Sequence, residues 1–547
     1  MIRDRLSGFK VGTLGALPDL PFNIKVLRKA GIARPMRPDK TVKVLISLGR
    51  WGASPAAGVA ASAIRYPGEP MLIDELGELT FAEVQSRTNR LARALAKQGV
   101  KEGDGVALMA RNHRGFVEAL LAVSKLGANA LFLNTMFSGP QIVGVIEREE
   151  PKAVIYDEEF DELIGHVDVD LKRFVAWNQD GVADETSLED LIAAEPDDTD
   201  LVAPDRSSKF VVLTSGTTGT PKGAQRGQPD TLSPIAALLS VIPLKAREKT
   251  MIAAPLFHSW GFAHFSIGLS LSSTYVLRRK FSPEGVLEAV ASEKASALIV
   301  VPVMIQRIME LPEETLAKYD LSSLKATAAS GSALPGPLAT KWMDATGDNL
   351  YNLYGSTEVA WATIATPEDL REAPGTAGRV PHGTLLRILD EDGKELPKGE
   401  VGRIFVGNDM KFEGYTGGGG KDIIDGLLSS GDVGHLDEEG RLFVDGRDDD
   451  MIVSGGENVF PREVEDLLAG HDAVKEIAVI GVDDDEFGQR LKAFLVLSDG
   501  ASLDEDEAKR YVKSNLAGYK VPREVVFMDE LPRNATGKVV KRELAEE

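Results

Sequence analysis

Segments with the apolar pattern of strands alternate with segments that have the pattern of amphipathic helices along most of this chain. Thr80 and Glu83 have the spacing of a capping box in front of the helix-like run 81–98. A second helix-like run covers 116–126, and strand-like runs cover 105–110, 153–156, 210–213, 298–301 and 385–389. Alternation of this kind is typical of α/β proteins with largely parallel sheets. The sequence therefore predicts an α/β fold with parallel or mixed sheets.

The chain is too long for one hydrophobic core, because it has 547 residues. Beyond Arg447 the pattern changes to short strands and helices at 477–482, 491–497, 504–516 and 525–528. The charged triplet Asp448–Asp450 marks the change, and the part after it is long enough for a small separate domain. We expect a basic N-terminal extension over 1–60, a large N-terminal domain over 61–447 and a small α+β C-terminal domain over 448–547.

The composition excludes several classes of protein. The formal net charge is −22, and an acidic surface repels phosphate backbones, so nucleic acid is not expected as a partner. The absence of cysteine excludes disulfides and a cysteine nucleophile, so thiol chemistry would need a thiol from another molecule. No apolar run approaches the ~18 residues that span a bilayer, and Pro18 and Asp19 end a short apolar stretch that could have suggested a signal peptide. We expect a soluble, cytoplasmic protein.

The N-terminal segment differs in charge from the rest of the chain. The first 50 residues carry eleven Lys or Arg and three Asp or Glu. Apolar residues such as Phe22, Ile24, Val44 and Ile46 are interleaved with these charges. Such a segment can pack on the acidic body of the protein, or it can lie on an anionic lipid surface as a peripheral membrane contact. Neither clustering nor periodicity decides between the two interpretations.

The stretch Thr214–Gly223 follows directly on a strand-like run and reads Thr-Ser-Gly-Thr-Thr-Gly-Thr-Pro-Lys-Gly. Its glycines let the backbone approach a ligand closely, its hydroxyl and amide groups are donors, and Lys222 adds a positive charge. Together these features suit a polyphosphate. The order differs from that of the G-x-x-x-x-G-K-[ST] loop, in which the hydroxyl after the lysine binds Mg²⁺. A magnesium ligand should therefore lie elsewhere in the chain.

The same loop resembles the signature of the adenylate-forming superfamily, which includes acyl-CoA synthetases, the adenylation domains of peptide synthetases and the beetle luciferases. Further segments resemble the other motifs of this family, in the family's order: 254–261, 354–358, 430–432, 446–450, 454–458 and 532–538. The resemblance covers about 60–545 of the chain, and it is greatest to long-chain fatty-acid–CoA ligases. It implies a large adenylate-forming lobe and a small, mobile C-terminal lid.

The resemblance implies an ATP site built from several of these motifs. Tyr354 would offer a flat face to the adenine, and Asp432 and Arg447 would hold the ribose through charge-assisted hydrogen bonds. Glu358 would bind Mg²⁺, a hard ion that prefers carboxylate and phosphate oxygen. The other expected ATP-binding residues are Thr214, Ser215, Gly216, Thr217, Thr218, Gly219, Lys222, Gly331, Ser332, Gly355, Ser356 and Thr357.

The resemblance also implies roles in the acyl and CoA steps. Lys538 would be catalytic, because its compact charge would bridge the substrate carboxylate and the phosphate. His258 would act as a gate and would line the acyl pocket together with Trp260 and Gly261. Asp449 would be the hinge of the lid. The expected CoA-binding residues are Ser454, Gly455 and Gly456.

We therefore expect an ATP-dependent acyl-CoA synthetase. A carboxylic acid and Mg-ATP would give acyl-AMP and pyrophosphate, and the cosubstrate CoA would then displace AMP. A fatty acid is the first choice of substrate and an aryl acid the second. Within the family, a luciferase or an acyl-AMP ligase that loads a carrier protein is the alternative. A non-catalytic nucleotide-binding scaffold is the alternative from another class, and the intact Lys222, Glu358, Asp432 and Lys538 argue against it.

Overall fold

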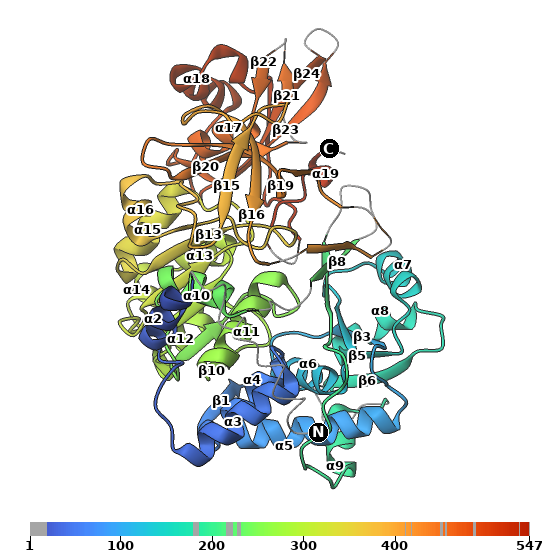
Figure 1. The fold of residues 1–547 in the computed structure, drawn as a ribbon. Helices are drawn as coiled ribbons and strands as arrows, with labels where there is room; N and C mark the ends of the chain where they lie inside the picture. Colours follow the sequence, from blue (N-terminus) through green and yellow to red (C-terminus); the bar gives the residue numbers. More distant parts are fainter. Residues whose placement is uncertain are drawn as a thin grey trace. The chain divides into compact units, whose positions relative to one another are not determined.

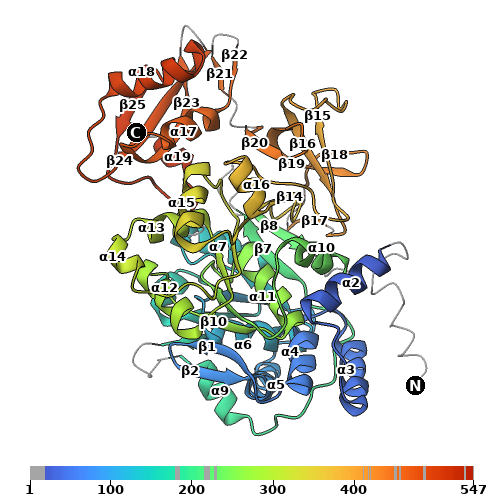
Figure 2. The same ribbon diagram turned by 90° about the vertical axis from the view of Figure 1, so that its left-hand side faces the viewer.

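The computed structural model describes residues 19–178, 185–214, 222–226, 231–410, 412–416, 418, 420–448, 452–454, 457–484, 488–534 and 537–545 (Figures 1 and 2). Internal contacts divide the chain into two units. The first unit comprises residues up to 300 together with 310–328 and 408–420, and the second comprises 301–309, 329–407 and 421 onward. Each unit is described by itself, and the domain limits at 60 and 447 stay predictions.

The first unit contains a seven-stranded sheet with the strand order β17-β8-β7-β4-β3-β5-β6. The strands from β7 to β6 are parallel, whereas β8 and β17 are antiparallel additions at one edge. The parallel strands are short and mostly buried, as is usual where helices cover both faces of a sheet. The strands are β3 Gly105–Met109, β4 Asn129–Phe132, β5 Ala153–Asp157, β6 Lys172–Trp177, β7 Phe210–Thr214, β8 Lys222–Arg226 and β17 Phe412–Tyr415.

Another group of strands in this unit has the order β11-β9-β10-β1-β2. These strands pair in parallel except β1 and β2, which pair antiparallel. The expected acyl-pocket segment follows the carboxyl end of β9, a position at which α/β proteins commonly bind ligands. The strands are β1 Pro70–Asp74, β2 Gly77–Thr80, β9 Lys249–Ile252, β10 Thr274–Leu277 and β11 Ala297–Val300.

Helices pack on these strands, and α5 begins at the capping box that the sequence predicts. At the start of α5, the Glu83 carboxylate accepts a 2.7 Å hydrogen bond from the Thr80 backbone, and the Thr80 hydroxyl accepts one from the Glu83 backbone, so the expected capping box is confirmed. The helices are α4 Pro55–Arg65, α5 Phe81–Lys97, α6 Arg114–Leu126, α7 Gly139–Glu149, α8 Asp161–Gly165, α9 Leu188–Ala194, α10 Ser233–Val241, α11 Ser259–Leu271, α12 Pro283–Glu293 and α14 Glu313–Leu316.

The N-terminal segment forms two further helices of the first unit, α2 Leu20–Ala30 and α3 Pro38–Trp51, which pack on other helices of that unit (Figure 2). Helix α2 packs on α10, where the Asn23 amide donates a buried 2.9 Å hydrogen bond to the Ser233 hydroxyl, and α3 packs on α4. The outer face of α3 exposes its apolar residues Val42, Leu45 and Ile46. The segment therefore packs on the body and still presents an apolar face. No helix in the described part of the chain is long and apolar enough to cross a membrane.

The second unit is built mainly from antiparallel strands. Its first sheet has the order β15-β16-β19-β18, with β20 paired to β19, and β13 pairs with β14. Its last sheet has the order β22-β21-β24-β23, with β25 in parallel on β24. The strands are β13 Leu350–Tyr354, β14 Thr363–Ala365, β15 Leu385–Leu389, β16 Gly402–Gly407, β18 Ile423–Ile424, β19 Leu427–Leu436, β20 Leu442–Arg447, β21 Ile452–Ser454, β22 Glu457–Val459, β23 Val474–Asp484, β24 Gly488–Leu497 and β25 Glu524–Phe527.

Two helices cover the last sheet and close the core of the C-terminal part. Val464 and Leu468 of α17 and Ala508 and Val512 of α18 are buried against strands of this sheet. The helices of the second unit are α13 Pro302–Met309, α15 Gly336–Thr346, α16 Pro367–Glu372, α17 Pro461–Ala469, α18 Glu505–Asn515 and α19 Lys541–Leu544.

The predicted α/β fold with a small C-terminal domain is confirmed. The helices expected at 81–98 and 116–126 and the expected strands lie where predicted, to within a few residues. The expected parallel or mixed sheets are confirmed as well: parallel pairing predominates in the first unit, and antiparallel pairing predominates in the second. There, short turns such as the one between β19 and β20 join consecutive strands, and a turn that short permits only antiparallel pairing.

Candidate active site

The second unit brings together Tyr354, Asp432 and Arg447. Tyr354 is the last residue of β13, and Asp432 and Arg447 lie directly opposite each other in the register of β19 and β20. The Tyr354 hydroxyl donates a 2.5 Å hydrogen bond to Oδ2 of Asp432, and Nη1 of Arg447 donates to Oδ1 over 3.4 Å. The expected adenine residue and the two expected ribose residues therefore form one connected cluster.

Burial and nearby charges act in opposite directions on the partly buried Asp432 carboxyl. Burial raises the pKa of the Asp432 carboxyl, and the Tyr354 hydrogen bond and the charges of Arg447, Lys538 and Lys421 oppose the rise. Burial also raises the pKa of Tyr354 well above its ordinary value, which keeps its hydroxyl protonated as a donor. Lys538, expected to be catalytic, thus lies near enough to influence this cluster.

The Gly355–Ala360 segment forms a tight turn after β13. The Ser356 hydroxyl donates to Oε2 of Glu358 over 2.8 Å and accepts from the backbone N–H groups of Glu358 and Val359. A side chain on Gly355 would meet the backbone oxygen of Ala360 at 2.0 Å, so only glycine fits there. Thr357 and Glu358 are buried in this turn. The turn therefore fixes the backbone that carries the expected magnesium ligand.

The expected phosphate loop joins β7 to β8. Thr214 and Lys222 pair across this hairpin, and the Lys222 ammonium lies 5.6 Å from the centroid of the Tyr415 ring. Ser215, Gly216, Thr217, Thr218 and Gly219 lie outside the described residues, so their part in ATP binding stays a prediction. Gly331 and Ser332 follow β12 Ala326–Ala329, and Gly331 has a φ of 99°. Their part in ATP binding also stays a prediction.

The expected acyl-pocket residues lie at the start of α11 in the first unit. His258 is the N-cap residue, and burial lowers its pKa to about 4, which keeps the imidazole neutral near pH 7 and agrees with a gating role. Nε1 of Trp260 donates to the backbone oxygen of Val300 over 3.0 Å. A side chain on Gly261 would meet the backbone oxygen of Pro255 at 2.3 Å, so glycine lets α11 approach the preceding segment.

Lys538 lies in a turn of the second unit that other residues hold in place. Its backbone N–H donates to Oδ1 of Asn534 over 3.0 Å, and Nη1 of Arg533 donates to the backbone oxygen of Gly537 over 2.6 Å. Arg533 also forms a 2.7 Å ion pair with Glu476 on β23. The lysine backbone is therefore tied to the last sheet.

The hinge and CoA-binding predictions fall largely outside the described residues. This applies to Asp449, Gly455 and Gly456, whose roles stay predictions. Ser454 ends β21, and its backbone pairs with that of Glu457 in β22. The described backbone on either side of 455–456 is thus an antiparallel hairpin.

Sequence reasoning missed residues that support the site. The Asn112 amide donates to the backbone oxygens of Ile252 and Ala254 and accepts from the N–H of Leu256, which fixes the segment before His258. Its signal was a polar residue just after a buried strand. Sequence reasoning also missed Lys421, whose charge acts on Asp432. The only sequence feature that could have pointed to it is the glycine-rich run directly before it.

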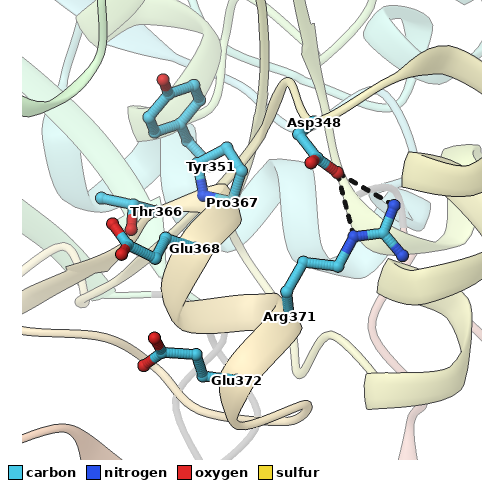
Figure 3. A pocket seen from close by; sticks show the side chains of 7 residues that line it. All are labelled: Asp348, Tyr351, Thr366, Pro367, Glu368, Arg371 and Glu372. Atoms are coloured by element: carbon cyan, nitrogen blue, oxygen red, sulfur yellow. Dashed lines mark hydrogen bonds and ion pairs between the residues drawn. The ribbon is translucent and has the colours of Figure 1, made fainter.

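The second unit also has an open surface depression of about 540 Å³ that contains none of the expected site residues (Figure 3). Asp348 and Arg371, joined by a 2.9 Å ion pair, lie on one side of it. The other lining residues are Tyr351, Thr366, Pro367, Glu368 and Glu372. Its charged and open lining does not resemble a pocket for an apolar acyl group.

Comparison with known proteins connects this geometry to a family. Residues 59–416 match the family described as AMP-binding enzyme, and residues 463–538 match the AMP-binding enzyme C-terminal domain. The chain belongs to the AMP-binding enzymes. The adenylate-forming resemblance inferred from the motifs is thereby confirmed.

Relatives of this AMP-binding enzyme include ligases of several acids. It is 34% identical over 490 residues to a feruloyl-CoA synthase of Amycolatopsis sp, covering 88% of this chain and 95% of the relative. It is 29% identical over 475 residues to a long-chain-fatty-acid–CoA ligase of Mycobacterium tuberculosis, covering 86% and 93%. The crystal structure of an anthranilate CoA ligase with anthranoyl-AMP has a TM-score of 0.80 at 27% identity, covering 90% and 96%.

The expected enzyme class, an ATP-dependent acid–thiol ligase that forms AMP, is confirmed for this AMP-binding enzyme. The family supports the use of ATP and CoA with a small-molecule acid. The relatives do not agree on one acid, so the expected fatty-acid substrate is not confirmed.

Proposed function

We propose that this protein is an acyl-CoA synthetase that works in two half-reactions. In the first, a carboxylate oxygen attacks the α-phosphorus of ATP, the bond to the β,γ-diphosphate breaks, and acyl-AMP and pyrophosphate form. In the second, the thiolate of CoA attacks the acyl carbon and AMP leaves. The observation that supports this most is the Tyr354, Asp432 and Arg447 cluster, with the charge of Lys538 nearby.

The residues of this cluster suit the nucleoside part of ATP. Asp432 is a partly buried acceptor between two donors, and ribose hydroxyls can replace or share these contacts. The Tyr354 ring, anchored through its hydroxyl, offers its face to adenine. Lys222 would hold the phosphates, and Lys538 would bring the carboxylate and the α-phosphate together, where two anions must meet.

Glu358 fits a magnesium ion that ATP brings with it. No group of three or more His, Asp or Glu side chains in the described ranges is arranged to hold a metal. Mg²⁺ commonly binds through one or two carboxylates together with substrate phosphates, so a single buried carboxylate in a rigid turn is suitable. Bound there, the ion would neutralise phosphate charge.

The acid we propose is an aryl or arylalkyl carboxylic acid, with a fatty acid as the alternative. The feruloyl and anthranilate ligases among the relatives support an aromatic acid, and the long-chain ligase supports an aliphatic one. Trp260 near the expected gate His258 favours a flat, apolar body. In the second half-reaction, Asp449 would act as hinge and Ser454, Gly455 and Gly456 would contact CoA.

The experiment incubates the full chain with Mg-ATP, CoA and one acid at a time: benzoate, 4-hydroxycinnamate, octanoate or palmitate. Pyrophosphate, AMP and the acyl-CoA thioester are measured in each reaction. We expect stoichiometric thioester and AMP with at least one acid, and acyl-AMP without thioester when CoA is omitted. Pyrophosphate release without thioester in the presence of CoA would favour a carrier-protein ligase. No acid-dependent pyrophosphate release would contradict the proposal.

We also propose that α3 makes a peripheral contact with anionic lipid. The exposed residues Val42, Leu45 and Ile46 lie on one helix face, and the exposed basic residues Lys43 and Arg50 flank it. Apolar side chains bordered by Lys and Arg are the pattern of helices that lie in a membrane interface. The cytoplasmic location stays a prediction.

A further inference from the structure

His264 carries a buried nitrogen atom that lacks a partner. The residue lies on α11, one turn after Trp260, and its side chain is 2% exposed. Nδ1 lies 3.3 Å from the backbone oxygen of Trp260. Nε2 is buried and has no hydrogen-bond partner among the residues that the structure describes. Leaving a buried polar atom unpaired is unfavourable, so Nε2 is available to a donor group that a ligand brings beside it.

The contact with Trp260 determines what kind of group that is. A backbone oxygen can only accept, so the proton of the neutral imidazole belongs on Nδ1. Burial lowers the pKa of His264 to about 4, which keeps the ring neutral at physiological pH. Nε2 then carries a lone pair and is an acceptor. A partner for Nε2 must be a donor, such as a hydroxyl, an amine or a ring N–H.

Aromatic packing holds α11 through Phe262 and Phe265. Phe262 lies 5.1 Å from Phe132 and 4.8 Å from Phe210, measured between ring centroids. Tyr275 of β10 packs on Phe265, and its hydroxyl donates to the Phe265 backbone oxygen over 2.5 Å. Helix α11 and β10 lie side by side in both views (Figures 1 and 2). These aromatic contacts hold the helix in place.

One stripe of α11 carries Trp260, His264, Ile267 and Leu271, all of them buried. The Trp260 and His264 rings are in contact, with centroids 4.1 Å apart and planes at 70°. Trp260 belongs to the expected acyl pocket, and its bond to Val300 fixes its indole. His264 therefore adds one acceptor to an apolar stripe, one helical turn beyond Trp260.

We propose that Nε2 of His264 accepts a hydrogen bond from a hydroxyl or N–H group of the acyl substrate, and that the enzyme thereby selects carboxylic acids that carry such a donor away from the carboxylate. This inference rests on the proposed function. His264 takes no part in making or breaking covalent bonds. An acid without the donor would leave Nε2 unpaired in the complex and would be used less efficiently.

The test compares acids that are matched in size and differ in the donor. Cinnamate, 3-hydroxycinnamate, 4-hydroxycinnamate and 4-methoxycinnamate form one series, and dodecanoate with 12-hydroxydodecanoate forms another. kcat and KM for each acid are measured by pyrophosphate release with the full chain, His264→Phe and His264→Gln. Tyr275→Phe is the matched control, because it removes a buried polar atom that is paired with the same helix.

We expect wild type to prefer a hydroxylated acid over its unsubstituted or methoxy partner by on the order of 10- to 100-fold in kcat/KM, mainly through KM. His264→Phe should bring the ratio near one, His264→Gln should keep part of it because its amide oxygen also accepts, and Tyr275→Phe should keep all of it.

The outcomes separate the two proposals. Turnover of acids without preference for a donor, or an unchanged ratio in His264→Phe, would overturn the role of His264 and leave the synthetase proposal intact. If His264→Phe does not fold, the ratio in His264→Gln decides: a value equal to that of wild type with unchanged KM overturns the role. No pyrophosphate release with any acid would overturn the proposed function itself.

Discussion

The Asp432 carboxylate accepts one hydrogen bond from the neutral Tyr354 hydroxyl and one from the Arg447 cation. We expect Asp432 and Tyr354 to contribute differently to ATP binding. Asp432→Ala removes the acceptor of ribose and should raise the KM for ATP by on the order of 10- to 100-fold, because hydrogen bonds to a charged group are strong. Tyr354→Phe keeps the ring and loses only the hydroxyl, so we expect a smaller increase. ATP–pyrophosphate exchange measures both. Equal KM values for wild type and Asp432→Ala would remove Asp432 from the ribose site.

Lys538 should matter to the first half-reaction and much less to the second. Lys538→Ala should slow acyl-AMP formation by several orders of magnitude, since one electrostatic contact in a transition state contributes about 10²- to 10³-fold and this one also orients the carboxylate. Lys541→Ala is the matched control, because Lys541 lies close in sequence and pairs with Glu465. With preformed acyl-AMP and CoA, the Lys538 variant should still make thioester. Comparable damage to both steps would contradict the assignment.

At the scale of elements, the β19–β20 hairpin contains a pH-dependent ion pair. The Asp445 carboxylate, 2.8 Å from Nδ1 of His435, raises the pKa of that histidine. The pair therefore stabilises the folded state fully below the unfolded pKa of about 6.5, and this contribution is lost as pH rises through the raised folded pKa.

His435→Asn should accordingly lower the free energy of unfolding at pH 5.5, by roughly 1 kcal/mol or less because the pair is partly exposed. At pH 9 the change should be close to zero. Urea unfolding at both pH values measures it, and Asp445→Asn should show the same pH dependence. A larger loss at pH 9 than at pH 5.5 would show that packing, and not charge, dominates at this position.

The outer face of α3 provides a test of lipid binding. Replacing Val42, Leu45 and Ile46 by serine should reduce sedimentation with vesicles that contain phosphatidylglycerol, because it removes apolar area at the interface. Turnover of a short acid should not change. Serine at the exposed residues Leu76 and Val202 of the same unit is the control and should leave binding intact. Absence of vesicle binding by wild type would dismiss the membrane contact.

At the scale of the whole molecule, the proposal requires two arrangements of the C-terminal part. Proline fixes φ near about −65°, so Asp449→Pro should block the backbone rotation of a hinge. We expect adenylation to persist and thioester formation to fall sharply. Pyrophosphate exchange, acyl-CoA formation and a melting curve are measured on one preparation. Normal thioester formation from acyl-AMP in a folded variant would show that Asp449 is not the hinge.

Local features of the fold could be predicted from the sequence, whereas distant pairings could not. The capping box of Thr80 and Glu83 depends on neighbouring residues alone, and it was predictable. The pairing of Asp432 with Arg447 depends on strand register, which shifts at Val433 and Gly434. The motifs gave the site residues by resemblance. A polar residue after a buried strand marks Asn112 as a candidate, but its contacts with the segment before His258 and the unpaired Nε2 of His264 depend on distant parts of the chain.

Strand β17 has a consequence for how the chain is made. The Thr416 hydroxyl accepts from the N–H of Gly223 across a sequence separation of 193 residues, beside the pairing of β17 with β8. During translation, β8 therefore emerges long before its outer neighbour and presents an unpaired edge throughout that interval. A gene fragment that ended before residue 408 would make that temporary edge permanent. Protection of the nascent chain by chaperones should matter most while those intervening residues are synthesised.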